Sequence, residues 1–170
     1  MSVLGRIADW RRRRFVRSRL SRNMTILDLS CGSGWLVEAL REEGYNAIGL
    51  DPNLPDSSSK SYLLKRSAYE TGFADESFDC IILLETIDHL EPRVYSEIRR
   101  VSKDGAKFLI TTPKKRWNWA IELLSSLGFA DPLVTPQINI VGPDDIPFQL
   151  EKAGSFIWLE WYGIYRIEKS

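Results

Sequence analysis

Short apolar runs alternate with amphipathic segments along most of this chain, and this alternation constrains its fold more than any other feature. Four runs have the length and composition of buried strands, at residues 24–29, 45–51, 78–84 and 107–112. Segments with helical spacing of apolar residues follow or separate them, at residues 33–43, 91–102 and 116–127. Strands that alternate with helices predict a doubly wound, mostly parallel α/β sheet around one core.

The remaining segments carry weaker signals. The stretch "YLLKR" (62–66) fits a third strand or the end of a short helix, and residues 128–141 read as a loop. Proline and aspartate at the start of "GPDDIPFQLEKAG" (142–154), with glycine at its end, predict a helix. The tail alternates apolar and polar residues around Gly163, which predicts a strand, a turn and a second strand. Such a hairpin would add an antiparallel edge to the sheet.

The N-terminal segment is strongly basic although the whole chain has no net charge. Residues 1–22 hold Asp9 as their one acidic residue and eight arginines, Arg6, Arg11, Arg12, Arg13, Arg14, Arg17, Arg19 and Arg22. Apolar residues over 3–20 suit an amphipathic helix, which could break near Arg11. We expect a basic helical segment, 1–22, packed on a domain formed by residues 23–170. Its charge favours a solvated face or pairing with the acidic body; an anionic lipid, a phosphorylated substrate or RNA is the other interpretation.

Composition argues against several classes of protein. No apolar run approaches the roughly 20 residues that a membrane-spanning helix needs, and no apolar segment typical of a secretory signal follows the basic N-terminus. Without such a signal, Cys31 and Cys80 are expected as free thiols in a reducing cytoplasm. Two separated cysteines and one histidine, His89, disfavour a zinc site, so no metal is expected.

The turn between the first strand and the first helix of the sheet is built from small residues. Gly32 and Gly34 allow a ligand to approach the main chain closely at the start of a helix. Asp51 ends the next strand, where a carboxylate can accept hydrogen bonds from the hydroxyls of a ribose. Asp28, just before the turn, would repel a pyrophosphate and attract a cation; it could equally cap the amides of its own loop. Asp28, with Trp35 in place of a third glycine, argues against a nicotinamide dehydrogenase.

Several blocks of the chain resemble class I S-adenosylmethionine-dependent methyltransferases, in the order in which that family has them. "TILDLSCGSGWLVEAL" resembles the first motif, and "YNAIGLDPN" the acidic turn after the second strand. "FADESFDCIILLETIDHLEP" is similar to the fourth-strand block, with its paired Asp88 and His89. "IRRVSKDGAKFLITTP" and "VTPQINIVGPDDIPFQLEKAG" are similar to the segments that follow, so the resemblance covers residues 24–170. It implies a seven-stranded Rossmann-like sheet and S-adenosylmethionine as the cofactor.

The resemblance also implies which residues hold the cofactor. They are Asp28, Ser30, Cys31, Gly32 and Gly34 beside its methionine part, Asp51 and Pro52 at the ribose, Ser67 and Ala68 at the adenine, and Leu84 and Glu85 at the sulfonium and amino group. Ser30 and Trp35 replace glycines of the family loop, and Ser67 replaces its adenine-reading acid, for which Glu70 is an alternative. Only 15 residues separate Asp51 from Ser67, so the second crossover helix must be short or missing.

Methyl transfer from a sulfonium is an in-line displacement in which the protein supplies mainly alignment. His89, after the fourth strand, is the candidate base for an acceptor that must lose a proton, or else a residue that packs or caps the next helix. We expect an enzyme acting on an unidentified, small-molecule acceptor. Two alternatives remain: a domain that binds S-adenosylmethionine without catalysis, as the short crossover suggests, and an RNA methyltransferase that uses the arginine-rich N-terminus. The sequence does not specify an oligomeric state.

Overall fold

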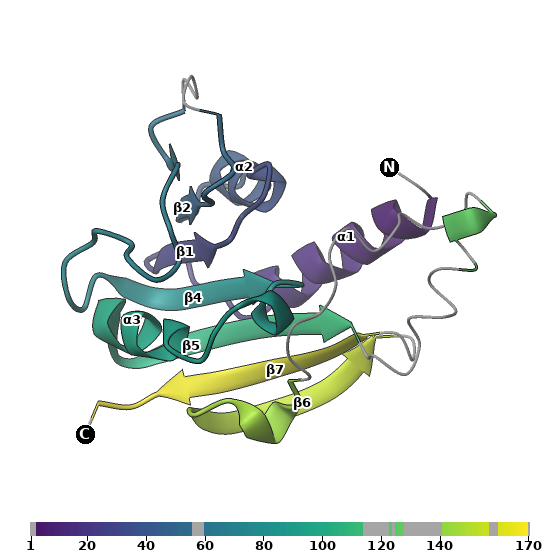
Figure 1. Ribbon diagram of the computed structural model, residues 1–170. Helices are drawn as coiled ribbons and strands as arrows, with labels where there is room; N and C mark the ends of the chain where they lie inside the picture. The colour runs from purple at the N-terminus through teal and green to yellow at the C-terminus, as the bar shows by residue number, and fades with distance from the viewer. Residues whose placement is uncertain are drawn as a thin grey trace.

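The computed structural model describes residues 3–55, 60–113, 123, 125–127, 141–156 and 160–169. Its centre is a seven-stranded sheet with the order β3-β2-β1-β4-β5-β7-β6 (Figure 1). The strands are β1 Thr25–Leu29, β2 Asn46–Leu50, β3 Leu63–Leu64, β4 Phe78–Leu84, β5 Ser102–Pro113, β6 Gln149–Phe156 and β7 Glu160–Ile167. The first five strands pair in parallel, whereas β7 is antiparallel to both of its neighbours. This confirms the mostly parallel sheet with an antiparallel C-terminal hairpin.

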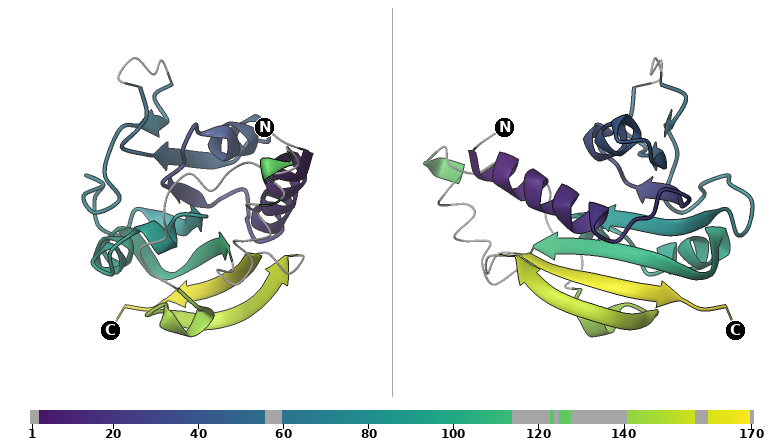
Figure 2. Two further views of the ribbon diagram at one scale, coloured as in Figure 1. Left: turned by 45° about the vertical axis from the view of Figure 1, so that its right-hand side comes forward. Right: turned by 180° about the vertical axis from the view of Figure 1, so that it is seen from behind.

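Helices cover both faces of the sheet, as predicted. Helices α1 (Val3–Arg17) and α2 (Trp35–Glu42) lie over one face, and α3 (Val94–Val101) lies over the other (Figure 2). Each helix turns an apolar stripe to the sheet, because residues three or four apart share a helix face. Buried Val16 of α1 and Leu40 of α2 share a core with Ile82, and Ile98 of α3 packs in a second core. None of the helices in the described ranges is long and apolar enough to traverse a bilayer.

Two expectations about the N-terminal half have clear outcomes. Helix α1 is continuous over Val3–Arg17, so the expected break near Arg11 is absent. In the connection from β2 to β3, the described residues 51–55 and 60–62 form no helix, which confirms the shortened crossover. The short connection leaves β3 with only two strand residues at the edge of the sheet.

The predicted helix over 142–154 is wrong. A single 3₁₀ turn, η3 (Pro143–Asp145), is followed by strand β6. The Asp145 side chain accepts a hydrogen bond from the Gly142 N–H at 2.7 Å, so the helix-start signal is real but serves one turn only. Pairing with β7 then decides the conformation, because tertiary contacts override the helix preference of "LEKA".

The predicted turn at Gly163 is also wrong. Gly163 lies inside β7, paired with Ile110 of β5 on one side and Ala153 of β6 on the other. A Cβ at this position would lie 2.3 Å from the ring of Tyr165, which is completely buried. The glycine therefore makes room for a ring and does not bend the chain. The hairpin is formed by β6 and β7; most of the helix expected over 116–127 and of the loop over 128–141 lies outside the described residues.

Candidate functional site

The turn between β1 and α2 lies at the carboxyl ends of the parallel strands, where ligands bind in open α/β sheets. Three of its residues have left-handed backbone conformations, Ser30 (φ 69°), Gly32 (φ 55°) and Gly34 (φ 84°). The N–H groups of Ser30 and Cys31 donate to the carbonyl of Leu50 at 2.8 and 3.0 Å. These bonds fix the turn against the end of the neighbouring strand β2.

The two glycines of the turn do different things. A Cβ on Gly34 would come within 2.6 Å of Leu63 Cδ1, so this glycine permits close packing of α2 on β3. A Cβ on Gly32 would meet nothing within 4 Å. Gly32 therefore presents bare backbone to open space, which is the feature that a ligand on the main chain requires.

Asp51 joins this turn to the end of β2. Its Oδ2 accepts a hydrogen bond from the Gly32 N–H at 3.0 Å, and its Oδ1 accepts one from the Asn53 N–H at 2.8 Å. The glycine turn and the acid that sequence reasoning selected are thus in direct contact. Because a carboxylate has about four lone-pair sites, Asp51 retains capacity for the hydroxyls of a ligand.

Asp28 is a buried acid beside the same turn. It lies on β1 between Gly49 of β2 and Ile82 of β4, and only 4% of it is exposed. Burial, and secondly the charge of Asp51, raise the pKa of Asp28 to about 7. A cationic ligand placed here would relieve both effects, whereas a pyrophosphate would aggravate them.

Asp28→Asn should change how stability depends on pH. An acid whose folded-state pKa is raised destabilises the fold increasingly as pH rises from about 3.8 towards 7, because the unfolded chain ionises first. We expect the variant to gain at least ~1 kcal/mol of unfolding free energy relative to wild type over this interval. Urea unfolding of both proteins at a series of pH values measures this gain. A pH-independent difference would contradict the buried-acid interpretation.

Cys31 belongs to the turn through its backbone, and its thiol points into the core. The thiol is buried against Gly49, where a Cβ would lie 2.8 Å from Cys31 Sγ. Burial raises the pKa of Cys31 to about 12, so the thiol is neutral and belongs to the core. Cys80 is likewise a buried free thiol. Pro52 is exposed next to Asp51, and no group of potential metal ligands occurs within the described part of the chain.

The residues expected at an adenine lie after β3. The Asp51 N–H donates to the Leu64 carbonyl at 3.1 Å, which places the ends of β2 and β3 side by side. Ser67 is exposed, and its hydroxyl accepts a hydrogen bond from the Tyr69 N–H at 3.2 Å. Ala68 is buried in the core, and Glu70 is exposed. No hydrogen bond among the described residues links Ser67 or Ala68 to Asp51 or Gly32, so their role stays a prediction.

The end of β4 carries an ion-pair cluster that sequence reasoning missed. Glu85, after partly buried Leu84, has a left-handed backbone (φ 59°) and accepts a hydrogen bond from the Thr111 hydroxyl at 2.7 Å. Arg12 of α1 lies 3.1 Å from the other oxygen of Glu85 and also pairs with Glu160 of β7. Burial raises the pKa of Glu85, and Arg12 opposes this rise. The carboxylate of Glu85 thus faces β5 and α1.

Asp88 and His89 lie in η1 (Ile87–His89), directly after β4. Asp88 is 2% exposed, and within the described part of the chain neither oxygen of its carboxylate has a hydrogen-bond partner. His89 Nε2 lies 3.8 Å from Asp88 Oδ2. A buried carboxylate without hydrogen bonds is costly, so this position favours a donor group supplied by a ligand.

The chain is similar to known methyltransferases. A family model described as a methyltransferase domain matches residues 3–155. The mitochondrial ubiquinone biosynthesis O-methyltransferase of Bos taurus is 31% identical over 153 residues, which cover 77% of this chain and 41% of the relative. The enzyme of the same name from Rhodopseudomonas palustris is 26% identical over 126 residues, 65% of this chain and 50% of the relative. The chain thus spans half or less of the length of these curated relatives.

Solved structures share the fold. The PH0226 protein of Pyrococcus horikoshii superposes with a TM-score of 0.68 at 21% identity, covering 91% of this chain and 87% of that one. A SAM-dependent methyltransferase of Aquifex aeolicus gives a TM-score of 0.65 at 17% identity, with 91% and 89% covered. Both confirm the Rossmann-like architecture.

Proposed function

Because this chain belongs to the methyltransferase-domain family, we propose that it transfers a methyl group from S-adenosylmethionine to a small-molecule acceptor. One observation carries the proposal: the carboxylate of Asp51 contacts the open backbone at Gly32, with buried Asp28 beside them. This arrangement offers acceptors for a ribose and a negative charge for an ammonium or sulfonium group. The cofactor supplies the reactive methyl group, and the chain binds and orients it.

Each predicted residue has a proposed place in this complex. Asp51 holds the ribose hydroxyls, and Asp28 faces the cationic methionine part. The backbone of Ser30, Cys31, Gly32 and Gly34 forms the surface on which that part rests, and Pro52 flanks the ribose. Ser67 and Ala68 border the adenine at the end of β3. Leu84 and Glu85 mark the side of the sulfonium at the end of β4.

The acceptor group that we propose is a hydroxyl. A hydroxyl must lose its proton during methyl transfer, and the Asp88–His89 pair lies at the end of β4 on the expected acceptor side. His89 would take the proton, and the charge of Asp88 would stabilise the resulting imidazolium. The O-methyltransferase names of the relatives support the same choice of acceptor.

Calorimetry and a product assay test the proposal together. Wild-type protein should bind S-adenosylmethionine and S-adenosylhomocysteine, and should form S-adenosylhomocysteine in the presence of a phenolic probe such as catechol or 3,4-dihydroxybenzoate. His89→Ala should slow this turnover roughly 100-fold and leave the cofactor dissociation constant unchanged. Failure to bind either cofactor form would refute the proposed function, and full activity of His89→Ala would remove the assigned base.

The short β2–β3 connection leaves little chain to cover an adenine, which favours a second function, a domain that binds the cofactor without catalysis. In that case the domain binds S-adenosylmethionine without turning it over, and the same assay shows binding but no product. An RNA methyltransferase would instead show an affinity for RNA that falls steeply with salt and disappears when residues 1–22 are deleted.

We propose the cytoplasm as the compartment of this protein, which the two separate buried thiols support.

A further inference from the structure

The outward face of α1 combines exposed apolar side chains with arginines. Trp10 is 60% exposed and Ile7 is 43% exposed, although both are large and apolar. Arg6, Arg14 and Arg17 are exposed on the same helix, and residues three, four and seven apart share a helix face. The opposite face of α1 is buried on the sheet through Phe15 and Val16. One face of α1 is therefore apolar and packs on the core, whereas the outward face carries both arginines and exposed apolar side chains.

The arginines of α1 divide into those with acidic partners and those without. Arg12 pairs with Glu85, Glu160 and Asp9, and both Arg13 and Arg17 pair with Glu43. Within the described part of the chain, no ion pair joins Arg6, Arg11 or Arg14 to a carboxylate. Among the described residues, these three positive charges of α1 are thus without a carboxylate partner and are available to an external anion.

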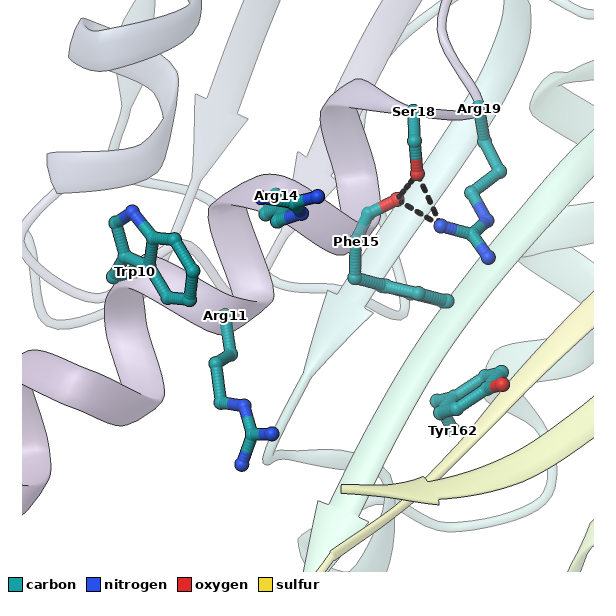
Figure 3. Close-up of a pocket in the computed structure, with 7 residues that line it drawn as sticks. All are labelled: Trp10, Arg11, Arg14, Phe15, Ser18, Arg19 and Tyr162. Atoms are coloured by element: carbon teal, nitrogen blue, oxygen red, sulfur yellow. Dashed lines mark hydrogen bonds between the residues drawn. The ribbon is translucent and has the colours of Figure 1, made fainter. Parts of the chain in front are cut away.

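A pocket of about 340 Å³ lies where α1 passes β7 (Figure 3). Its lining includes three arginines, Arg11, Arg14 and Arg19, and three aromatic rings, Trp10, Phe15 and Tyr162. The Arg14 guanidinium lies 5.7 Å from the Trp10 ring centre, and Arg19 lies 4.6 Å from that of Phe15. Figure 3 shows that the three arginines approach the pocket from separate positions along the helix and the turn after it. Arginines beside aromatic rings suit a ligand that carries an anionic group on an apolar molecule.

We propose that the outer face of α1 docks on an anionic phospholipid bilayer, with a headgroup phosphate in the pocket of Arg11, Arg14 and Arg19. Guanidinium groups match phosphate oxygens in planar, forked geometry. Trp10 lines the pocket, is 60% exposed and enters the interfacial layer, where indole rings are favoured. Ile7, less than one turn away, follows it into the same layer.

The exposed apolar residues favour a bilayer over a nucleic acid. A base could stack on Trp10, but a nucleic acid offers no apolar layer in which Ile7 would be stabilised. A flat bilayer can also contact Arg6, Ile7, Trp10 and Arg14 at once, because they lie along one side of a single straight helix. This docking site is independent of the cofactor site and does not rest on the proposed function.

Vesicle co-sedimentation tests the proposal. The 170-residue chain should bind vesicles of equimolar phosphatidylcholine and phosphatidylglycerol, and should bind pure phosphatidylcholine vesicles much less. Arg14→Glu should reduce the bound fraction roughly tenfold, since each cation near an anionic surface contributes on the order of 1 kcal/mol. Trp10→Ala should lower binding to the anionic vesicles by several-fold. Raised salt should weaken the wild-type interaction.

Arg93→Glu is the matched control, because Arg93 is an exposed arginine at the start of α3, on the other face of the sheet. It changes the net charge by the same amount and should bind anionic vesicles as wild type does. Circular dichroism checks that each variant is folded. Equal binding to both vesicle types, absence of binding, or equal losses for Arg14→Glu and Arg93→Glu would overturn the proposal. So would Arg14-dependent binding of an RNA oligonucleotide without vesicle binding, which would assign the surface to nucleic acid.

Discussion

Asp51→Ala should weaken binding of S-adenosylmethionine by roughly 100-fold or more. In the proposed complex the carboxylate accepts both ribose hydroxyls, and hydrogen bonds to a charged group contribute about 1.5–3 kcal/mol each. The substitution also removes the acceptor of the Gly32 N–H, so the turn under the methionine part loses its link to β2. Isothermal titration with S-adenosylmethionine and S-adenosylhomocysteine measures the effect. Both forms should lose affinity, since they share the ribose.

Asp79→Ala separates loss of the ligand contact from loss of a structural carboxylate. Asp79 accepts hydrogen bonds from the N–H and hydroxyl of Thr25 at 2.8 Å, and it pairs with Lys103 at 2.9 Å. It lies near the start of β4, whereas Asp51 follows the end of β2, so the two acids lie at opposite ends of the parallel strands. We expect Asp79→Ala to lower thermal stability and to leave cofactor affinity within about twofold of wild type. Equal affinity losses in both variants would show that Asp51 acts only through the fold.

The glycine turn and its acid are predictable because their signals are local. A buried strand, a cluster of small residues and a helix follow one another within residues 25–42, and the structure places each where the pattern predicts. Asp51 follows from the same logic, since parallel strands end at a common edge. The contact of Asp51 with Gly32 is then a consequence of adjacent strands β1 and β2.

The C-terminal hairpin is not predictable from local signals. Residues 149–156 contain good helix formers, yet they form a strand because β7 supplies a pairing edge. Gly163 has the residue type of a turn, but the Tyr165 ring occupies the space above it. Asp88 is similar, because nothing in "ETIDHL" indicates that this carboxylate is 2% exposed without a hydrogen bond in the described region. In each case the decisive neighbour is identified only after the chain has folded.

The role of Arg12 is the least predictable from local sequence, because its partners Glu85 and Glu160 are distant along the chain. The local pattern makes it one of four consecutive arginines, Arg11–Arg14, with no feature that separates it from the others. In the structure it is the arginine that faces the sheet, between Glu85 at the end of β4 and Glu160 at the start of β7. Its guanidinium connects α1 to two strands. The Arg12 Nε is buried and has no hydrogen-bond partner in the described region, so this arginine is held by its Nη groups.

Arg12→Ala should reduce the free energy of unfolding by about 2–4 kcal/mol, because it leaves two largely buried glutamates without a counter-charge. The side chains of Glu85 and Glu160 are 23% and 15% exposed, so solvent compensates only in part. Chemical unfolding followed by circular dichroism measures the loss. The substitution should also release the N-terminal part of α1, which protease susceptibility within residues 3–11 would report.

Arg13→Ala is the control on the neighbouring position. Arg13 pairs with Glu43, but its side chain is 38% exposed, and exposed ion pairs contribute at most about 1 kcal/mol. The two variants should also differ in pH dependence. Burial raises the pKa of Glu85 to about 7 although Arg12 lowers it, so without Arg12 this pKa rises further and the folded variant takes up a proton at higher pH than the folded wild type does. The deficit of Arg12→Ala should therefore shrink as pH falls towards about 7, where Glu85 of the wild type also becomes protonated, whereas that of Arg13→Ala should stay nearly constant. Equal and pH-independent deficits would mean that Arg12 stabilises α1 through its aliphatic stem, and not through its charge.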